Sequence, residues 1–146
     1  MGQDLALAAA LCVAAIAVAV AINAMRPSPI AWSVPAGKAV KSLSLEETLG
    51  ASHDGQVVFL DARDPYFYAE GHLPRARNVP RSQLGQAAKY VSALPRHSPV
   101  IVYCSDEGCA DSGIVGRYLV TLGFQDVSVY KGGWEEWSAA ELPVEK

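Results

Sequence analysis

The run Val100–Tyr103 constrains the fold more than any other stretch of the chain. Its four residues all favour β-strands and present apolar side chains to both faces. A strand buried on both faces is typical of a parallel sheet that helices cover on either side. The run ends at Cys104, and a short polar loop separates this thiol from a helical pattern that begins at Asp111 or Ser112. The sequence therefore places a thiol at the carboxyl end of a buried strand.

The rest of residues 42–146 alternates short strands with helical patterns. A capping box at Ser44–Glu47 opens the first helix, and further strands and helices follow in turn. This alternation predicts right-handed crossovers, so we expect an α/β fold with a central, mainly parallel sheet flanked by helices. The predicted strands are Gln56–Leu60, Asn78–Pro80, Val100–Tyr103 and Val127–Tyr130, and the predicted helices are Leu45–Gly50, Pro65–Gly71, Ser82–Leu94, Ser112–Leu122 and Trp134–Ala140.

The position of Cys104 is one at which open α/β sheets bind ligands. Backbone N–H groups of the loop and the dipole of the following helix both favour a negative charge there. They would stabilise a thiolate, which is the reactive form of cysteine, or an oxyanionic substrate. Cys104 is therefore a candidate nucleophile, and the alternative is a buried cysteine that acts only as a small apolar residue.

The N-terminal segment has a different character from the rest of the chain. Leu5–Ala24 contains no charged residue and, as a helix, would span about 30 Å, the thickness of a bilayer core. No Lys or Arg precedes it, and it is long for the apolar part of a signal peptide, which favours a retained membrane helix over a cleaved signal. The predicted organisation is a tail at 1–4, a transmembrane helix at 5–25, a linker at 26–41 and an α/β domain at 42–146.

Basic residues follow this apolar segment and do not precede it. Arg26, Lys38 and Lys41 lie on its carboxyl side, whereas only Asp4 and the terminal amine lie before it. The positive-inside rule therefore predicts a single-pass membrane protein whose α/β domain lies in the cytoplasm. Residues 26–41 hold three prolines and no amphipathic period, which is typical of a linker.

Charge and cysteine content exclude several classes of function. The chain has 146 residues and a net charge of −3 without a basic stripe, which argues against nucleic-acid binding. Its three cysteines do not have the spacing of a disulfide framework. The histidines are scattered, and no second Cys/His pair accompanies Cys104 and Cys109, so we expect neither a metal nor another cofactor.

Four groups of residues occur in a fixed order along the predicted domain. They are Asp61-Ala62-Arg63 with Tyr68; Gly71-His72-Leu73-Pro74 with Ala76, Asn78 and Pro80; Val100–Tyr103 with Cys104; and Gly123-Phe124 with Val127, Gly132-Gly133-Trp134 and Trp137. In this order and spacing they resemble the signatures of rhodanese-like domains, a family of sulfurtransferases. The resemblance covers about Lys41–Glu145, which is nearly the whole of the predicted domain.

The resemblance implies a small α/β domain that transfers sulfane sulfur from a donor to a thiophilic acceptor. It implies that Cys104 attacks thiosulfate or a protein or small-molecule persulfide, becomes a persulfide and passes the sulfur to a thiol. Arg63, on the neighbouring strand end, is a candidate for substrate binding by the same resemblance. With the predicted anchor, a membrane-protein partner is also expected. The implied substrate or persulfide loop comprises Ser105, Asp106, Glu107, Gly108, Cys109, Ala110, Asp111 and Ser112.

The loop after Cys104 departs from the usual family pattern. It carries three acidic residues and no Lys or Arg, and negative charge beside a thiolate raises its pKa and repels thiosulfate. It also contains Cys109, which would resolve a persulfide or sulfenate on Cys104 if the loop brings the two sulfurs together. The alternative is that Cys109 is a loop residue without a role. Ala110 stands where the phosphatase branch of the fold has its arginine, so phosphate chemistry is not expected.

Three hypotheses therefore remain open. The first is a membrane-anchored sulfurtransferase or persulfide carrier that uses Cys104. The second is a thiol–disulfide redox protein that uses the Cys104/Cys109 pair, and the third is a non-catalytic rhodanese-like binding module.

Overall fold

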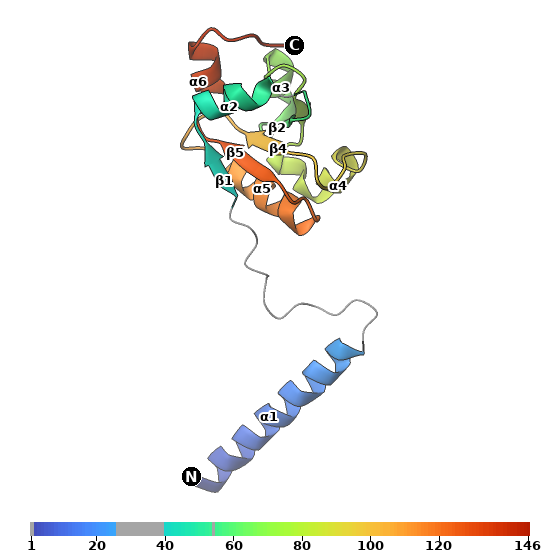
Figure 1. The fold of residues 1–146 in the computed structure, drawn as a ribbon. Coiled ribbons are helices and arrows are strands. Elements are labelled where there is room, and N and C mark those ends of the chain that lie inside the picture. Colours follow the sequence, from blue (N-terminus) through green and yellow to red (C-terminus); the bar gives the residue numbers. More distant parts are fainter. Residues whose placement is uncertain (1, 26–39, 54) are drawn as a thin grey trace. The chain divides into compact units, whose positions relative to one another are not determined.

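Five parallel strands form one sheet in the order β1-β5-β4-β2-β3 (Figure 1). This is a computed structural model, and it describes residues 2–25, 40–53 and 55–146. The central strand β4 pairs with β2 on one side and with β5 on the other. The strands are β1 (Lys41–Leu43), β2 (Val58–Asp61), β3 (Arg77–Asn78), β4 (Val100–Tyr103) and β5 (Val127–Tyr130). The predicted α/β fold with a central parallel sheet is confirmed.

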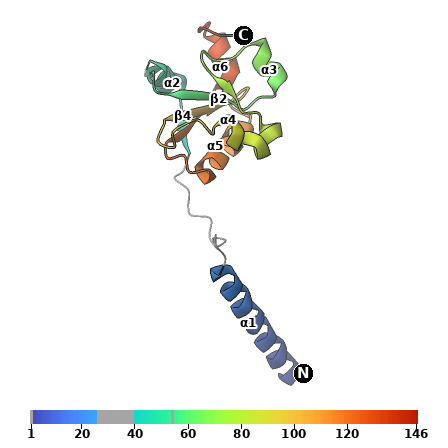
Figure 2. The same cartoon turned by 90° about the vertical axis from the view of Figure 1, so that its right-hand side faces the viewer.

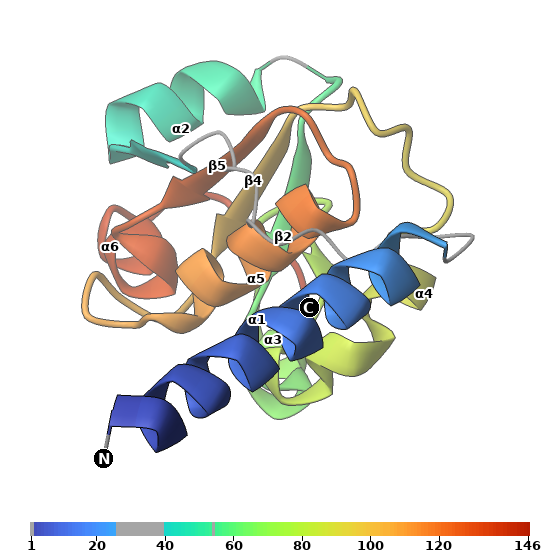
Figure 3. The same ribbon diagram turned by 90° about the horizontal axis from the view of Figure 1, so that it is seen from below.

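Helices cover both faces of this sheet (Figures 1 and 2). They are α2 (Leu45–Ser52), α3 (Pro65–Glu70), the 3₁₀ helix η1 (Arg81–Gln86), α4 (Ala87–Tyr90), α5 (Asp111–Thr121) and α6 (Gly133–Ala139). Side chains alternate across a strand, so β4 contributes to a core on each side. Val100 and Val102 pack with residues of α4 and α5, whereas Ile101 and Tyr103 pack with Trp137 of α6. Seen from below, α5 and α4 lie on one side of the sheet and α2 on the other (Figure 3).

The ends of α5 match the sequence pattern closely. The helix begins at Asp111 and is followed by Gly123, whose φ of +93° lies in the left-handed region that glycine tolerates. The N–H groups of Gly123 and Phe124 donate to the carbonyls of Val120 and Leu119, over 3.0 and 3.2 Å. This pair of bonds is the Schellman arrangement, which satisfies carbonyls that the helix itself leaves unpaired.

Two parts of the predicted secondary structure are corrected. Lys41, assigned to the linker, begins strand β1, which pairs with β5. In place of the helix predicted over Ser82–Leu94, the structure has η1, which is kinked at Gln83 (φ −115°, ψ 27°), followed by the short α4. Gly85 lies within η1 and disfavours a longer helix, since glycine loses more backbone entropy than other residues when it becomes helical.

The chain divides into two units, Met1–Ala36 and Gly37–Lys146, and each is described by itself. In the first unit the predicted helix is confirmed as α1 (Gly2–Ala24). Within residues 2–25, 40–53 and 55–146, no helix combines the length and apolar character needed to cross a membrane. The predicted transmembrane span is therefore not supported, and the cytoplasmic location of the domain stays a prediction. Most of the predicted linker lies outside the described residues.

Candidate functional site

Cys104 directly follows β4, at the carboxyl end of the central strand, and is 3% exposed. The start of α6 holds the backbone here, because the N–H groups of Trp134 and Glu135 donate to the carbonyls of Cys104 and Ser105 over 2.9 and 2.8 Å. Gly133 allows this close approach. Its φ is +63°, and a Cβ atom at this position would lie 2.5 Å from the Cys104 carbonyl oxygen. The position of Cys104 is thus fixed by two elements, β4 and α6.

The loop after Cys104 turns back on itself. The N–H of Gly108 donates to the Asp106 side chain over 2.7 Å, and the N–H of Cys109 donates to the Asp106 carbonyl over 3.2 Å. An aspartate that accepts a bond from the backbone two residues on is a common turn-forming device. The turn returns Cys109 to Cys104, and their sulfurs are joined in a disulfide with a Cα–Cα distance of 6.2 Å. The loop therefore brings the two thiols together.

The helix α5 begins immediately after this loop. Its first residue is Asp111, and the next, Ser112, is 3% exposed. No side chain caps the N–H groups in the first turn of this helix, because the residue at the cap position is Ala110. Such N–H groups, together with the helix dipole, favour an anion close to the disulfide.

One acidic side chain lies close to both sulfurs, and two more lie in the loop between the two cysteines. Asp106 and Glu107 lie in the loop itself, and an Asp111 carboxylate oxygen lies within 4.8 Å of both sulfur atoms. No Lys or Arg occurs between Cys104 and Ser112. The electrostatic environment is thus mixed, because backbone donors favour an anion and carboxylates oppose it. Cys104, Cys109 and Asp111 also have metal-ligating atom types, but sulfurs joined in a disulfide offer no thiolate to a metal.

Arg63 lies in a buried ion pair with Asp61. Its side chain is 4% exposed and donates from Nε and Nη2 to Asp61, with a shortest distance of 2.6 Å. Nη2 also donates to the Gly71 carbonyl over 2.7 Å, and the guanidinium lies 4.7 Å from the centre of the Trp134 ring. Asp61 and Gly71 engage donors of the Arg63 side chain, and its role in substrate binding stays a prediction. Burial alone would lower the pKa of Arg63, but its bonds with Asp61 outweigh burial and raise that pKa.

Tyr103 completes this buried network, and sequence reasoning missed its role. Its hydroxyl donates to Asp61 over 2.7 Å and accepts from the N–H of Leu73 over 3.1 Å. Burial, followed by the charge of Asp61, raises the pKa of Tyr103 well above its usual range. A tyrosine that ends a strand buried on both faces was a signal for such a bond, because buried hydroxyls need a partner. The network lies directly before Cys104 and supports the strand end that carries it.

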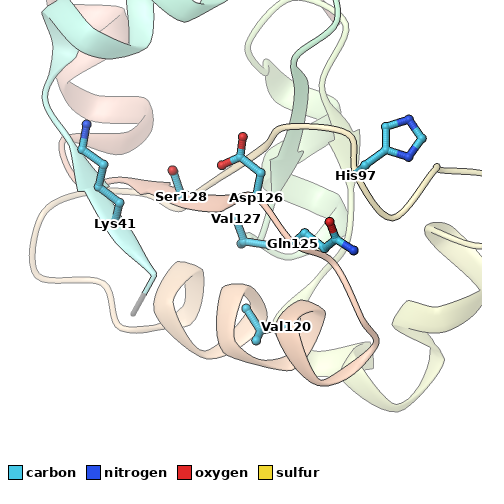
Figure 4. Close-up of a pocket in the computed structure, with 7 residues that line it drawn as sticks. All are labelled: Lys41, His97, Val120, Gln125, Asp126, Val127 and Ser128. Atoms are coloured by element: carbon cyan, nitrogen blue, oxygen red, sulfur yellow. The ribbon is translucent and has the colours of Figure 1, made fainter. Parts of the chain in front are cut away.

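A separate cavity of about 400 Å³ lies at the other end of the sheet (Figure 4). It borders Lys41 and Val127, the first residues of β1 and β5. Cys104 follows the last residue of β4. Because all these strands are parallel, the cavity lies at their amino ends and Cys104 at the carboxyl end. The cavity is lined by Lys41, His97, Val120, Gln125, Asp126, Val127 and Ser128. It does not belong to the Cys104 site.

Comparisons with known proteins agree with this architecture. A sequence model of the rhodanese-like domain family matches residues 44–140. Thiosulfate sulfurtransferase GlpE from Pseudoalteromonas translucida is 32% identical over 102 residues, which cover 70% of this chain and 92% of that enzyme. The 3-mercaptopyruvate sulfurtransferase of Escherichia coli (strain K12) is 31% identical over 126 residues, which cover 70% of this chain and 44% of that protein. The chain thus spans under half the length of this second relative.

Solved structures share the fold. A protein from Bacillus halodurans superposes with a TM-score of 0.65 at 23% identity, covering 72% of this chain and 76% of that one. A rhodanese-like domain from Anabaena superposes with a TM-score of 0.61 at 26% identity, covering 71% of this chain and 77% of that one.

Proposed function

Because this chain belongs to the rhodanese-like domain family, we propose that it is a sulfurtransferase that carries sulfane sulfur as a persulfide on Cys104. Homology to thiosulfate and 3-mercaptopyruvate sulfurtransferases supports sulfur transfer in general. The observation that carries the assignment to Cys104 is its position between the carboxyl end of β4 and the start of α5. A thiolate there would follow a buried strand and precede the N-terminus of a helix that no side chain caps.

The proposed reaction has two sulfur-transfer steps. In the first, the Cys104 thiolate attacks the outer sulfur of a persulfide donor, forming a Cys104 Sγ–S bond as the donor S–S bond breaks. The electron pair of the broken bond leaves with the donor thiolate. In the second, an acceptor thiolate attacks the outer sulfur of the Cys104 persulfide, and Cys104 departs as a thiolate. With thiosulfate as donor, the leaving group of the first step would be sulfite.

The charge of the loop bears on which donor the site accepts. Thiosulfate carries two negative charges, and an alkyl persulfide carries at most one. Asp106, Glu107 and Asp111 repel both, but they repel the dianion more strongly. We therefore propose a persulfide, either on a protein or on a small molecule, as the donor, and a thiol as the acceptor.

Neutralising the acidic loop should raise the rate with thiosulfate. Asp106→Asn keeps an oxygen for the Gly108 N–H, and Glu107→Gln keeps the size of the side chain. We expect each to raise the thiosulfate rate roughly tenfold at low salt, because a unit charge about 6 Å from a dianion in water is repelled by about 1.4 kcal/mol. Sulfite release measures the rate.

The same variants should change the rate with an alkyl persulfide less, and added salt should reduce both effects. Glu46→Gln, on the exposed surface of α2, is the matched control and should leave the thiosulfate rate unchanged. An equal rise for Glu46→Gln and Glu107→Gln would contradict a local effect of the loop.

The proposed function is tested by the thiol that the donor releases. The reduced chain is mixed with glutathione persulfide, and we expect a rapid release of about one glutathione per chain, because Cys104 is the one residue proposed to attack the donor. Cys104→Ser should release none above the rate without protein, whereas Cys12→Ser should behave as the wild type. Release by Cys104→Ser at the wild-type rate would overturn the assignment.

The disulfide favours one second candidate, a thiol–disulfide protein that uses Cys104 and Cys109 without carrying sulfur. In Cys109→Ser, such a protein would release hydrosulfide and keep glutathione as a mixed disulfide on Cys104, whereas a sulfur carrier would release glutathione and keep the added sulfur. A non-catalytic binding module would do neither.

A further inference from the structure

We propose that Cys109 is a second catalytic residue, which resolves the Cys104 persulfide and releases its outer sulfur as sulfide. This step rests on the proposed function, because it needs a persulfide on Cys104. It adds an activity to sulfur transfer, namely the reduction of sulfane sulfur. The disulfide between Cys104 and Cys109 is the product that this step would leave behind.

The geometry of the loop supports a direct reaction between the two residues. Their Cα atoms are 6.2 Å apart, within the range that a disulfide spans without movement of the backbone. Asp106 holds the turn through its bonds with Gly108 and Cys109, so the return of Cys109 toward Cys104 follows from the structure of the loop. Cys109 therefore has a high effective concentration at the Cys104 sulfur.

The step balances in atoms and electrons. The Cys109 thiolate attacks the inner sulfur of the persulfide, which is Sγ of Cys104, and a bond forms between the two cysteine sulfurs. The bond between Cys104 Sγ and the outer sulfur breaks, and the outer sulfur leaves with the electron pair as hydrosulfide. Over uptake and resolution together, starting from the two thiols, each cysteine sulfur loses one electron and the sulfane sulfur gains two. The proton that the Cys109 thiol loses is taken up, through solvent, by the departing outer sulfur, which therefore leaves as hydrosulfide.

Charge near the sulfurs favours this outcome over a long-lived persulfide. A persulfide is more acidic than a thiol and is therefore anionic at neutral pH. The Asp111 carboxylate lies within 4.8 Å of both sulfur positions, and Asp106 and Glu107 add negative charge in the same loop. These carboxylates repel the bound anion. A neutral disulfide and a diffusible hydrosulfide relieve this repulsion.

A further turnover needs an external dithiol, which reduces the disulfide and regenerates both thiols. The two sulfurs differ in access, because Cys104 is 3% exposed whereas Cys109 is only partly buried. The dithiol is expected to attack Cys109 and to release Cys104 as the leaving thiolate. The partner implied by this chemistry is a dithiol reductant.

A single-turnover experiment tests the role of Cys109. The full-length chain is reduced, freed of reductant without air and mixed with one equivalent of glutathione persulfide. Released glutathione reports sulfur uptake by Cys104, and released sulfide reports resolution. For the wild type we expect about one of each per chain, the loss of both thiols and a Cys104–Cys109 disulfide in the peptide map.

Cys109→Ser should still release glutathione but yield no sulfide, and its Cys104 should keep the added sulfur. Cys109→Ala provides a second variant with the same expectation, and Cys12→Ser should match the wild type. Sulfide release from Cys109→Ser at the wild-type rate would overturn the step, as would a wild-type chain that keeps its persulfide. If no chain releases glutathione, the proposed function fails, and this step fails with it.

Discussion

The chain with the Cys104–Cys109 disulfide closed should release no glutathione from glutathione persulfide, whereas the reduced chain should release about one per chain. A sulfur atom that is already bonded to Cys109 has no thiolate to attack the donor. Reduction opens the disulfide and restores the nucleophile. The measurement compares the same preparation before and after treatment with a dithiol, which is removed before the donor is added.

Cys109→Ser is the matched control for this effect, because it keeps Cys104 and removes its disulfide partner. It should release glutathione equally well with and without prior reduction. Cys12→Ser keeps the pair and should depend on reduction as the wild type does. Full activity of the oxidised wild type, with the disulfide shown to be intact, would contradict the assignment of Cys104 as the nucleophile.

Asp61→Ala should cause the largest loss of stability in the domain, about 3–5 kcal/mol in the free energy of unfolding. The substitution leaves Arg63 charged and buried, with a side chain that is 4% exposed and no counter-ion. It also removes the acceptor of the Tyr103 hydroxyl. Denaturant unfolding of the purified variant measures the effect.

Two comparisons make this prediction specific. Tyr103→Phe removes the hydroxyl's bonds with Asp61 and with the Leu73 N–H and leaves the ion pair intact, so a smaller loss of about 1–3 kcal/mol is expected. Lys41→Ala breaks an ion pair on the surface, in which the side chain of Lys41 is 66% exposed and that of Glu47 is 47% exposed. Its loss should lower the free energy of unfolding by less than about 1 kcal/mol. A loss for Asp61→Ala no greater than that for Lys41→Ala would contradict the structural role of the network.

Strong local patterns made most of the fold predictable. The start of α5 at Asp111 follows from the apolar period of the helix, and its end follows from Gly123. Strand β1 was missed because it has three residues, Lys41–Leu43, of which only Leu43 is buried. It lies at the edge of the sheet, where pairing with β5 decides the structure and local sequence carries little signal.

The N-terminal segment shows how composition separates two predictions. Alanine makes up half of Leu5–Ala24 and is the strongest helix former, so the helix was predictable from these residues. The alanine side chain contributes little apolar surface, so the same composition supports a membrane span less strongly than it supports a helix.

The candidate site was predictable only in part. The position of Cys104 follows from the end of a buried strand, which sequence patterns locate well. The meeting of Cys104 and Cys109 depends on the turn that Asp106 and Gly108 form, and spacing alone leaves that turn undetermined. The partner of Arg63 was also open, because an arginine two residues after Asp61 can face either the site or the core.

The location of the transferred sulfur tests the central claim most directly. The reduced Cys109→Ser variant is treated with one equivalent of glutathione persulfide, alkylated and mapped by peptide mass spectrometry, because its persulfide has no neighbouring thiol to resolve it. We predict one added sulfur atom on the peptide that contains Cys104 and none on the peptide that contains Cys12. Added sulfur on Cys12 alone, or on neither peptide, would contradict the account.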